Sequence, residues 1–313
     1  MYKLGIDLGG TNIAAGIVDE NYSVIVKYSM PTLLPDTPKN IVGRIMDASY
    51  KALKRANLSI DDISSVGIGS PGAVDSNKGI VLFANNLNFR NVDLGGMLSE
   101  KFGKKVYCEN DANAAAFGEY LVTGSKEDTL VAITIGTGIG GGIIIDGKIY
   151  SGNRYSGGEL GHMVINFEGI KCSCGRRGCF EAYASANALI GQTKEAMQKN
   201  LNSAMWSLCN GNINDVTGKT AFDGLKIGDA TAKQVVEKYA DYVSIGLVDI
   251  INTIGPSKIC ISGGISNEGE YILEPIRRHI ELNRPINCQT SVYVAKLGND
   301  AGIVGAANLD ISR

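Results

Sequence analysis

The stretch YKLGIDLGGTNIAAGIVDE, residues 2–20, decides the fold. It consists of two apolar runs joined by a glycine-rich turn, and it closes on an acidic residue. Apolar runs of this length on either side of a glycine turn are typical of the two strands of a β-hairpin. The sequence therefore predicts that the chain begins with a strand, a turn and a second strand.

A second copy of this pattern, LVAITIGTGIGGGIIIDGK, occupies residues 130–148. A constant offset of 127 residues superposes Ile6 on Ile133 and Gly9 on Gly136. Two similar strand-turn-strand units so far apart indicate a duplicated domain.

Strands and helices alternate in both halves of the chain. Helices are predicted over residues 38–57, 111–121, 231–254 and 298–309, and strands over 64–70, 105–110 and 258–264. This alternation favours an α/β architecture that binds ligands at the carboxyl ends of its strands.

Composition excludes several classes of protein. The 313 residues are 44% hydrophobic, and 30 basic residues against 32 acidic ones give a formal charge of −2. This balance indicates no nucleic-acid or membrane partner. No apolar run is long enough to span a membrane and no leader pattern precedes the first strand, so we expect a cytoplasmic protein with reduced cysteines.

The first glycine turn has the residue types of a phosphate site. Gly9 and Gly10 let the backbone approach a ligand closely, Thr11 and the exposed amides can donate, and Asp7 can hold a hydrated cation. A plain β-turn explains a single Gly-Gly pair equally well.

The second turn favours the phosphate interpretation. Its glycines, Gly136–Gly142, stand at the equivalent position of the second copy, with Thr134 and Thr137 as further donors. Two equivalent turns that face each other across a cleft would clamp a nucleotide with its Mg²⁺. The chain lacks the P-loop pattern, and no Rossmann pattern follows the first strand.

Three cysteines cluster in KCSCGRRGCFE, residues 171–181. The spacing is C-x-C-x4-C and not the C-x-x-C of a redox pair, and His162 lies ten residues upstream. Three thiolates and one imidazole form a closed tetrahedral set, which predicts structural Zn²⁺ on His162, Cys172, Cys174 and Cys179. The alternative is three reduced thiols beside an unrelated histidine.

Asp111, in ENDAN, follows a predicted strand and opens a predicted helix. An acid there can cap the helix or act as the general base of phosphoryl transfer to an alcohol. Spacing alone favours the cap.

Further polar groups point to a sugar. The predicted zinc loop would fix the carboxylates of Glu159 and Glu181 relative to each other. Together with Asn110 and Asp111 they would form a rim of hydrogen-bond acceptors for a polyhydroxylated ligand.

Eight stretches resemble the ROK family of bacterial sugar kinases and related repressors, in the family's order. They are GIDLGGTNIAAGIVD, GIGSPGAVD, ENDANAAAFGE, ITIGTGIGGGIIIDG, GGELGH, CSCGRRGCFEAYAS, ISGGIS and LGNDAGIVGAA. The resemblance implies a duplicated actin-like, hexokinase-type ATPase fold (ribonuclease H-like), with two lobes around a cleft. We expect a small lobe of residues 1–110, completed by the helix of residues 300–313, and a large lobe of residues 111–299 with the zinc loop.

The resemblance also assigns site residues. It makes Asp111 the catalytic base, against the capping interpretation, and it has His162 serve both zinc and sugar through its two ring nitrogens. The residues matching the family's sugar contacts are Gly72, Asn110, Asp111, Glu159, His162 and Glu181. Those matching its ATP site are Asp7, Gly9, Gly10, Thr11, Asn12, Thr134, Gly136, Thr137, Gly138, Gly263 and Gly264.

The activity implied by the resemblance is an ATP- and Mg²⁺-dependent kinase acting on the 6-hydroxyl of glucose. N-acetylmannosamine, N-acetylglucosamine, mannose, allose and fructose are alternative substrates, and Asn85 or Asn86 in LFANNLNF would help to discriminate among them. A sugar-sensing regulator is disfavoured because the first glycine turn begins at Asp7, which leaves no room ahead of it for a DNA-binding domain. The family further implies a homodimer or homotetramer.

Overall fold

The computed structural model describes residues 1–124, 128–284 and 289–312. The chain divides into two compact units: unit 1 comprises Met1–Ala132, Gly142–Gly158 and Lys296–Arg313, and unit 2 comprises Ile133–Gly141 and Glu159–Ala295. The expected boundary after residue 110 therefore lies elsewhere. The C-terminal helix does belong with the N-terminal segment, as expected, but residues 111–132 belong there too.

The first sheet has the strand order β3-β2-β1-β4-β8. Its strands are β1 (Tyr2–Leu8), β2 (Asn12–Val18), β3 (Val24–Pro31), β4 (Ile63–Ser70) and β8 (Val106–Asn110). The predicted hairpin is present, since β1 and β2 pair antiparallel with Leu8 opposite Ile13. β4 then runs parallel to β1, and β8 runs parallel to β4, so the carboxyl ends of three strands share one edge.

The second sheet repeats this plan, with the order β11-β10-β9-β12-β13. Its strands are β9 (Leu130–Ile135), β10 (Ile139–Ile145), β11 (Lys148–Ile149), β12 (Lys258–Ser262) and β13 (Ser291–Val294). The offset of 127 residues carries β2 onto β10. The duplication inferred from the two glycine turns thus extends to all five strands.

A small antiparallel sheet of β5 (Ala73–Asp75), β6 (Ile80–Ala84) and β7 (Phe89–Val92) also belongs to unit 1. This sheet was not predicted from the sequence. These strands are three to five residues long, and β6 and β7 mix buried with exposed positions, so they carry little periodic signal.

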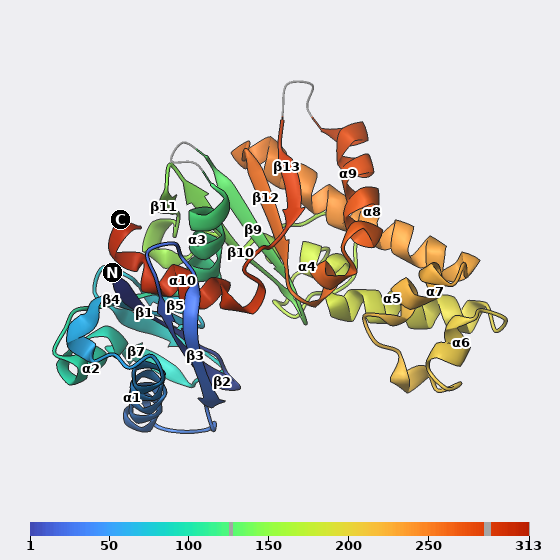
Figure 1. The fold of residues 1–313 in the computed structure, drawn as a ribbon. Coiled ribbons are helices and arrows are strands. Elements are labelled where there is room, and N and C mark those ends of the chain that lie inside the picture. Colours follow the sequence, from blue (N-terminus) through green and yellow to red (C-terminus); the bar gives the residue numbers. More distant parts are fainter. Residues whose placement is uncertain (125–127, 285–288, 313) are drawn as a thin grey trace. The chain divides into compact units, whose positions relative to one another are not determined.

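Helices α1 (Pro38–Arg55), α2 (Leu94–Phe102), α3 (Asp111–Thr123) and α10 (Ala301–Ala307) complete unit 1. Helix α1 begins where Thr37 caps the amide of Asn40 and Pro38 sets the first turn, and its apolar stripe, which includes Ile41 and Ile45, is buried. The two chain ends lie in this unit, where Lys3 and Asp310 form a salt bridge of 2.7 Å (Figure 1).

Helix α10 packs with its backbone directly against its neighbours. A Cβ on Gly305 would lie 1.7 Å from the carbonyl oxygen of Ala114 in α3, and one on Gly118 would lie 2.3 Å from that of Ala301. On the sheet side, a Cβ on Gly5 would meet the carbonyl oxygen of Ile303 at 1.9 Å. Only glycine permits this approach, and it is the reason that α3 belongs with α10 in unit 1.

The helices of unit 2 are α4 (Phe180–Ala184), α5 (Ala186–Lys199), α6 (Met205–Leu208), α7 (Thr220–Lys226), α8 (Ala230–Ile254) and α9 (Glu270–Asn283). The long helix predicted at residues 231–254 is α8. Asp229 caps its start by accepting from the Ala232 amide at 2.7 Å, and Gly255, with φ +60°, ends it one residue before Pro256. Helix α9 runs alongside α8 (Figure 1).

Within the described residues, none of these helices combines the length and apolar character that crossing a membrane requires.

The α3–α10 packing predicts opposite outcomes for two helical glycines. Gly305→Ala should destabilise the protein by about 1–3 kcal/mol or more, because its methyl group overlaps the Ala114 carbonyl. Gly43→Ala, at an exposed position of α1 with nothing within 4 Å, should stabilise it by about 0.5–1 kcal/mol. Urea denaturation of both variants tests this, and equal stability of the two would contradict the packing.

Candidate active site

The first glycine turn joins β1 to β2 and is held in place by Thr32, the residue that follows β3. The amide of Gly9 donates to the carbonyl oxygen of Asn12 at 2.8 Å, which closes the turn. The buried Thr32, just after β3, donates its hydroxyl to the Gly9 carbonyl at 2.7 Å and its amide to the Thr11 carbonyl at 2.8 Å. Thr32 thus occupies the carbonyl oxygens of Gly9 and Thr11. The amides of the turn other than that of Gly9 are available to a ligand.

Two carboxyl groups sit beside this turn, where parallel strands end. Burial, together with the negative charge of Asp111, raises the pKa of Asp7 to about 6, although Lys27 opposes the shift. Burial also raises the pKa of Asp111, against the lowering effect of its hydrogen bond from the Ala112 amide. Buried acids with raised pKa values in a cluster are typical of functional sites.

Asp111 is the first residue of α3, but it is not the cap. Asn110 caps the helix by accepting from the Asn113 amide at 3.1 Å, so the role that spacing alone gave to Asp111 belongs to its neighbour. The side chain of Asn110 also donates to the Gly72 carbonyl at 2.9 Å. The Asp111 carboxyl is thereby left for another task.

Gly72 occupies a position that no other residue would fit. Its φ is +90°, and a Cβ there would lie 2.0 Å from the Phe83 carbonyl oxygen. The segment after β6 passes close by, and the side chain of Asn86 lies 3.4 Å from where a Cβ of Gly10 would be. Unit 1 thus gathers Gly72, Asn110 and Asn86 near the first glycine turn.

The second glycine turn joins β9 to β10 and belongs to unit 2. The amide of Gly136 donates to the Gly138 carbonyl at 2.9 Å, and the Ala186 amide at the start of α5 donates to the Gly136 carbonyl at 2.9 Å. The Thr134 hydroxyl is hydrogen-bonded to the Ser262 hydroxyl at 2.8 Å. This bond connects the turn to the end of β12.

Gly263, directly after β12, has φ +91°, and a Cβ there would lie 2.2 Å from the Ile135 carbonyl oxygen. The glycine therefore lets the chain pass closely over the end of β9. Gly264 follows with open space around it.

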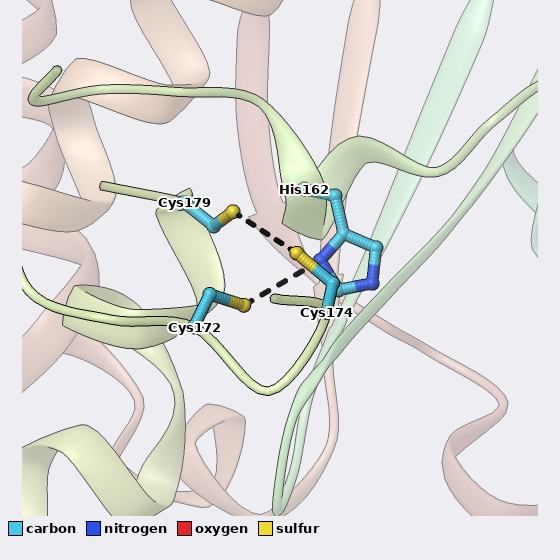
Figure 2. A group of neighbouring side chains, drawn as sticks. All are labelled: His162, Cys172, Cys174 and Cys179. Carbon is cyan, nitrogen blue, oxygen red and sulfur yellow. Dashed lines mark hydrogen bonds between the residues drawn. The ribbon is translucent and has the colours of Figure 1, made fainter. Parts of the chain in front are cut away.

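His162, Cys172, Cys174 and Cys179 converge on one point in unit 2 (Figure 2). Their candidate ligand atoms all lie within 4.8 Å of one another. The Cys172 sulfur lies 3.9 Å from Nδ1 of His162, and the sulfurs of Cys174 and Cys179 are 3.6 Å apart. Tetrahedral bonds of about 2.0–2.3 Å place ligand atoms roughly 3.3–3.8 Å apart, so the residue types suit zinc and the separations of 3.6 and 3.9 Å are close to those of a zinc site.

The electrostatics of the cluster also suit a cation. Hydrogen bonds from Arg176 lower the pKa of the Cys174 thiol to about 6, whereas burial raises that of Cys179 to about 12. Three thiolates so close together require positive charge to compensate them. Figure 2 shows Nδ1 of His162 facing the sulfurs, with Nε2 on the far side of the ring.

Two further acids lie beside this cluster. Glu159 is exposed and precedes the short 3₁₀ turn Leu160–His162, in which the His162 amide donates to the Glu159 carbonyl at 3.0 Å. Glu181, in the first turn of α4, accepts from the Ile139 amide at 2.9 Å and from the Ser173 hydroxyl at 3.3 Å.

The structure gathers the predicted residues in two groups. The first, in unit 1, contains Asp7, Gly9, Gly10, Thr11, Asn12, Gly72, Asn110 and Asp111, and the second, in unit 2, contains Thr134, Gly136, Thr137, Gly138, Glu159, His162, Cys172, Cys174, Cys179, Glu181, Gly263 and Gly264. Thr32, Ser173 and Ser262 also hold site residues in place and were not predicted from the sequence. They are single hydroxyl residues in ordinary contexts, and nothing in the sequence distinguishes them.

Known proteins resemble this chain along its whole length. The family model "ROK family" matches residues 3–312. A glucokinase of Streptomyces coelicolor is 37% identical over 98% of this chain and 96% of its own length. A xylose repressor of Caldicellulosiruptor bescii is 31% identical over 99% of this chain, but over only 78% of the repressor.

A solved structure gives the same picture. The ROK family glucokinase from Streptomyces griseus, in complex with glucose and AMPPNP, superposes with a TM-score of 0.80 at 36% identity, over 99% of both chains. The predicted fold class, a duplicated actin-like and hexokinase-type α/β ATPase fold, is thereby confirmed. From the family model, the relatives and this shared architecture, we conclude that the chain belongs to the ROK family.

Proposed function

We propose that this protein is a glucokinase, which transfers the γ-phosphate of ATP to the 6-hydroxyl of glucose. The observation that carries the proposal is the match over 99% of both chains to a ROK glucokinase bound to glucose and AMPPNP. The local geometry agrees, because a buried carboxyl group beside a glycine turn is what transfer to an alcohol needs.

Asp111 is the proposed catalytic base. Its raised pKa moves it toward the range in which a carboxylate accepts a proton efficiently near neutral pH. Because Asn110 takes over the helix cap and holds Gly72, the Asp111 carboxyl remains available to the 6-hydroxyl of a bound sugar.

The two glycine turns are the proposed phosphate sites. Their amides, with the hydroxyls of Thr11 and Thr137, would donate to the phosphate oxygens of ATP. Gly263 and Gly264 would border the adenosine. Asp7 would hold Mg²⁺, whose charge would offset that of the phosphates. Burial raises the pKa of Asp7 because it destabilises the ionised carboxylate, and a bound cation would compensate that negative charge.

The proposed sugar contacts are Gly72, Asn110, Asp111, Glu159, His162 and Glu181. Gly72, Asn110 and Asp111 belong to unit 1, and Glu159, His162 and Glu181 belong to unit 2. A carboxylate accepts hydrogen bonds from sugar hydroxyls, while His162 would use Nε2 for the sugar and Nδ1 for the metal cluster.

The metal proposed for His162, Cys172, Cys174 and Cys179 is structural Zn²⁺. Four protein ligands close its coordination shell, so it would shape the loop and take no part in the reaction. We also propose, on the family resemblance, that the protein assembles as a homodimer or homotetramer.

A second candidate function, sugar-dependent regulation, is favoured by the similarity to xylose repressors. It predicts sugar binding without phosphorylation. Other hexoses and the N-acetylated sugars remain alternative substrates for the kinase, since Asn85 and Asn86 lie in the segment proposed to discriminate among them.

The paired acids are also expected to lower the stability of the free protein. The pKa of Asp7 is about 6 in the folded state, against 3.8 for an aspartate carboxyl that is free in water. Between these values the folded state retains a proton that the unfolded state has lost, so stability falls as the pH rises from 3.8 to 6. Above this window the penalty is complete, at about 3 kcal/mol.

A coupled ADP-release assay with Mg-ATP tests the function directly. Across glucose, mannose, fructose, allose, N-acetylglucosamine and N-acetylmannosamine, we expect the highest kcat/KM with glucose. Turnover with none of these sugars, by protein that binds both ATP and glucose, would reject the kinase and support the regulator. A preference for an N-acetylated sugar would replace glucose as the substrate.

Asp111→Asn should lower kcat by at least about a hundredfold, since general-base catalysis contributes about 10²–10⁴. Glucose binding, measured by calorimetry, should persist because the amide is nearly the same size and still forms hydrogen bonds. Near-normal turnover would show that the base lies elsewhere.

Asp7→Asn should stabilise the free protein by about 3 kcal/mol at pH 8, and by about half as much at pH 5, because the neutral amide avoids the burial penalty. Urea denaturation at the two pH values measures this. The matched control is Asp47→Asn on the exposed side of α1. A gain that does not change with pH would contradict the raised pKa of Asp7.

Purified protein should contain about one zinc per chain, and Cys174→Ala should lose it. The exposed position of Cys174 means that the substitution itself opens no cavity, so a lower unfolding temperature would come from loss of the metal. Cys209→Ala, at a buried thiol outside the cluster, should retain the metal. Zinc in the Cys174 variant, by elemental analysis, would contradict the assignment.

A further inference from the structure

The carboxylate of Glu181 is held at both oxygens by two different segments of unit 2. Oε2 accepts from the amide of Ile139, which begins β10 directly after the second glycine turn, at 2.9 Å. Oε1 accepts from the hydroxyl of Ser173, in the loop between two of the clustered cysteines, at 3.3 Å. The side chain therefore spans from the proposed phosphate site to the proposed zinc loop.

Crowding on the glycine side leaves the carboxylate little freedom there. A Cβ on Gly138 would lie 2.2 Å from Oε2, so the glycine is what makes room for the acid. A hollow of about 550 Å³ opens beside the same group, lined among others by Thr137, Lys171 and Ser173. Without the Ser173 hydroxyl, Oε1 could turn into this hollow.

Ser173 is in turn placed by the backbone of its loop. The Cys172 amide donates to the Arg176 carbonyl at 2.8 Å, and the Gly175 amide donates back to the Cys172 carbonyl at 3.1 Å. This tight turn presents the hydroxyl toward α4. Ser173 itself is exposed, so it contributes little to packing and its hydroxyl can be removed without opening a cavity.

We propose that Ser173 is a positioning residue for sugar recognition, because its hydroxyl fixes the Glu181 carboxylate in the orientation that accepts from a sugar hydroxyl. The inference rests on the proposed function. Each carboxylate oxygen can accept two hydrogen bonds, so the anchors at Ile139 and Ser173 leave capacity for the sugar on both oxygens. The structural zinc loop thus acts on sugar affinity through one side chain.

The test compares Ser173→Ala with wild type and with Ser173→Thr, which restores a hydroxyl. In Ser173→Ala the KM for glucose should rise about three- to tenfold, the range expected for one hydrogen bond to a charged group that water partly replaces. The KM for ATP and the zinc content should stay unchanged, and Ser173→Thr should recover most of the loss. Ser207→Ala, at an exposed serine of α6 in the same unit, is the matched control.

A double-mutant cycle shows whether Ser173 acts through Glu181. Glu181→Gln alone should raise the KM for glucose strongly, and adding Ser173→Ala to it should have little further effect, because there is no carboxylate left to orient. Independent effects in the two backgrounds would overturn the proposal. So would an unchanged glucose KM in Ser173→Ala, or loss of its zinc.

Failure of the proposed function would look different. In that case the wild-type protein itself would phosphorylate none of the sugars. If the wild type is active and Ser173→Ala has the same KM for glucose, only the positioning role of Ser173 is refuted.

Discussion

The close approach of α10 to its neighbours is the constraint on which the rest of unit 1 depends. Four glycines, Gly5, Gly67, Gly118 and Gly305, let backbone meet backbone between β1, β4, α3 and α10. With side chains at these positions α10 could not fit between the sheet and α3. This packing sets the end of β1 beside the start of α3, where burial first of all, and then the negative charge of Asp111, raise the pKa of Asp7.

The duplicated sheets use one architecture for two kinds of turn. In the first, the glycine turn is closed by the Gly9 amide and held by a buried residue, Thr32, whose hydroxyl and amide both donate to carbonyl oxygens of the turn. In the second, the turn is held by the start of α5 and by Glu181, and so it is joined to the loop with the cysteine cluster. The repeated strand order places each glycine turn at the same point of its sheet. The segments that contact each turn, Thr32 in the first and α5 with Glu181 in the second, make the two turns chemically different.

Much of the architecture was predictable because it is encoded locally. The hairpins, the repeat and α8 follow from runs of apolar residues and from caps such as Asp229 and Gly255. The cysteine cluster was predictable for the same reason, since three of its four residues lie within eight residues of sequence. The structure brings His162 and the three cysteines together as expected. The binding of a metal, and its identity, stay predictions.

The rest depends on contacts between distant residues. The unit boundary could not be placed because it is set by α3 meeting α10, more than 170 residues later, as the Glu119 carboxylate also shows by accepting from the amides of Lys296 and Leu297. Spacing alone favoured Asp111 as the helix cap, although Asn110 is an equally good cap and only the backbone geometry decides between them. The short strands β5 to β7 carry too few residues for a periodic pattern.

The late position of α10 in the chain has a consequence for biosynthesis. The surface of β1, β4 and α3 that it covers is completed within the first 123 residues, but its cover is translated only after residue 300. During synthesis this apolar surface therefore remains uncovered while most of unit 2, from Glu159 to Ala295, leaves the ribosome and begins to fold. Unit 1 therefore begins to be synthesised first, but it can complete this packing only after the segment Glu159–Ala295 of unit 2 has been made.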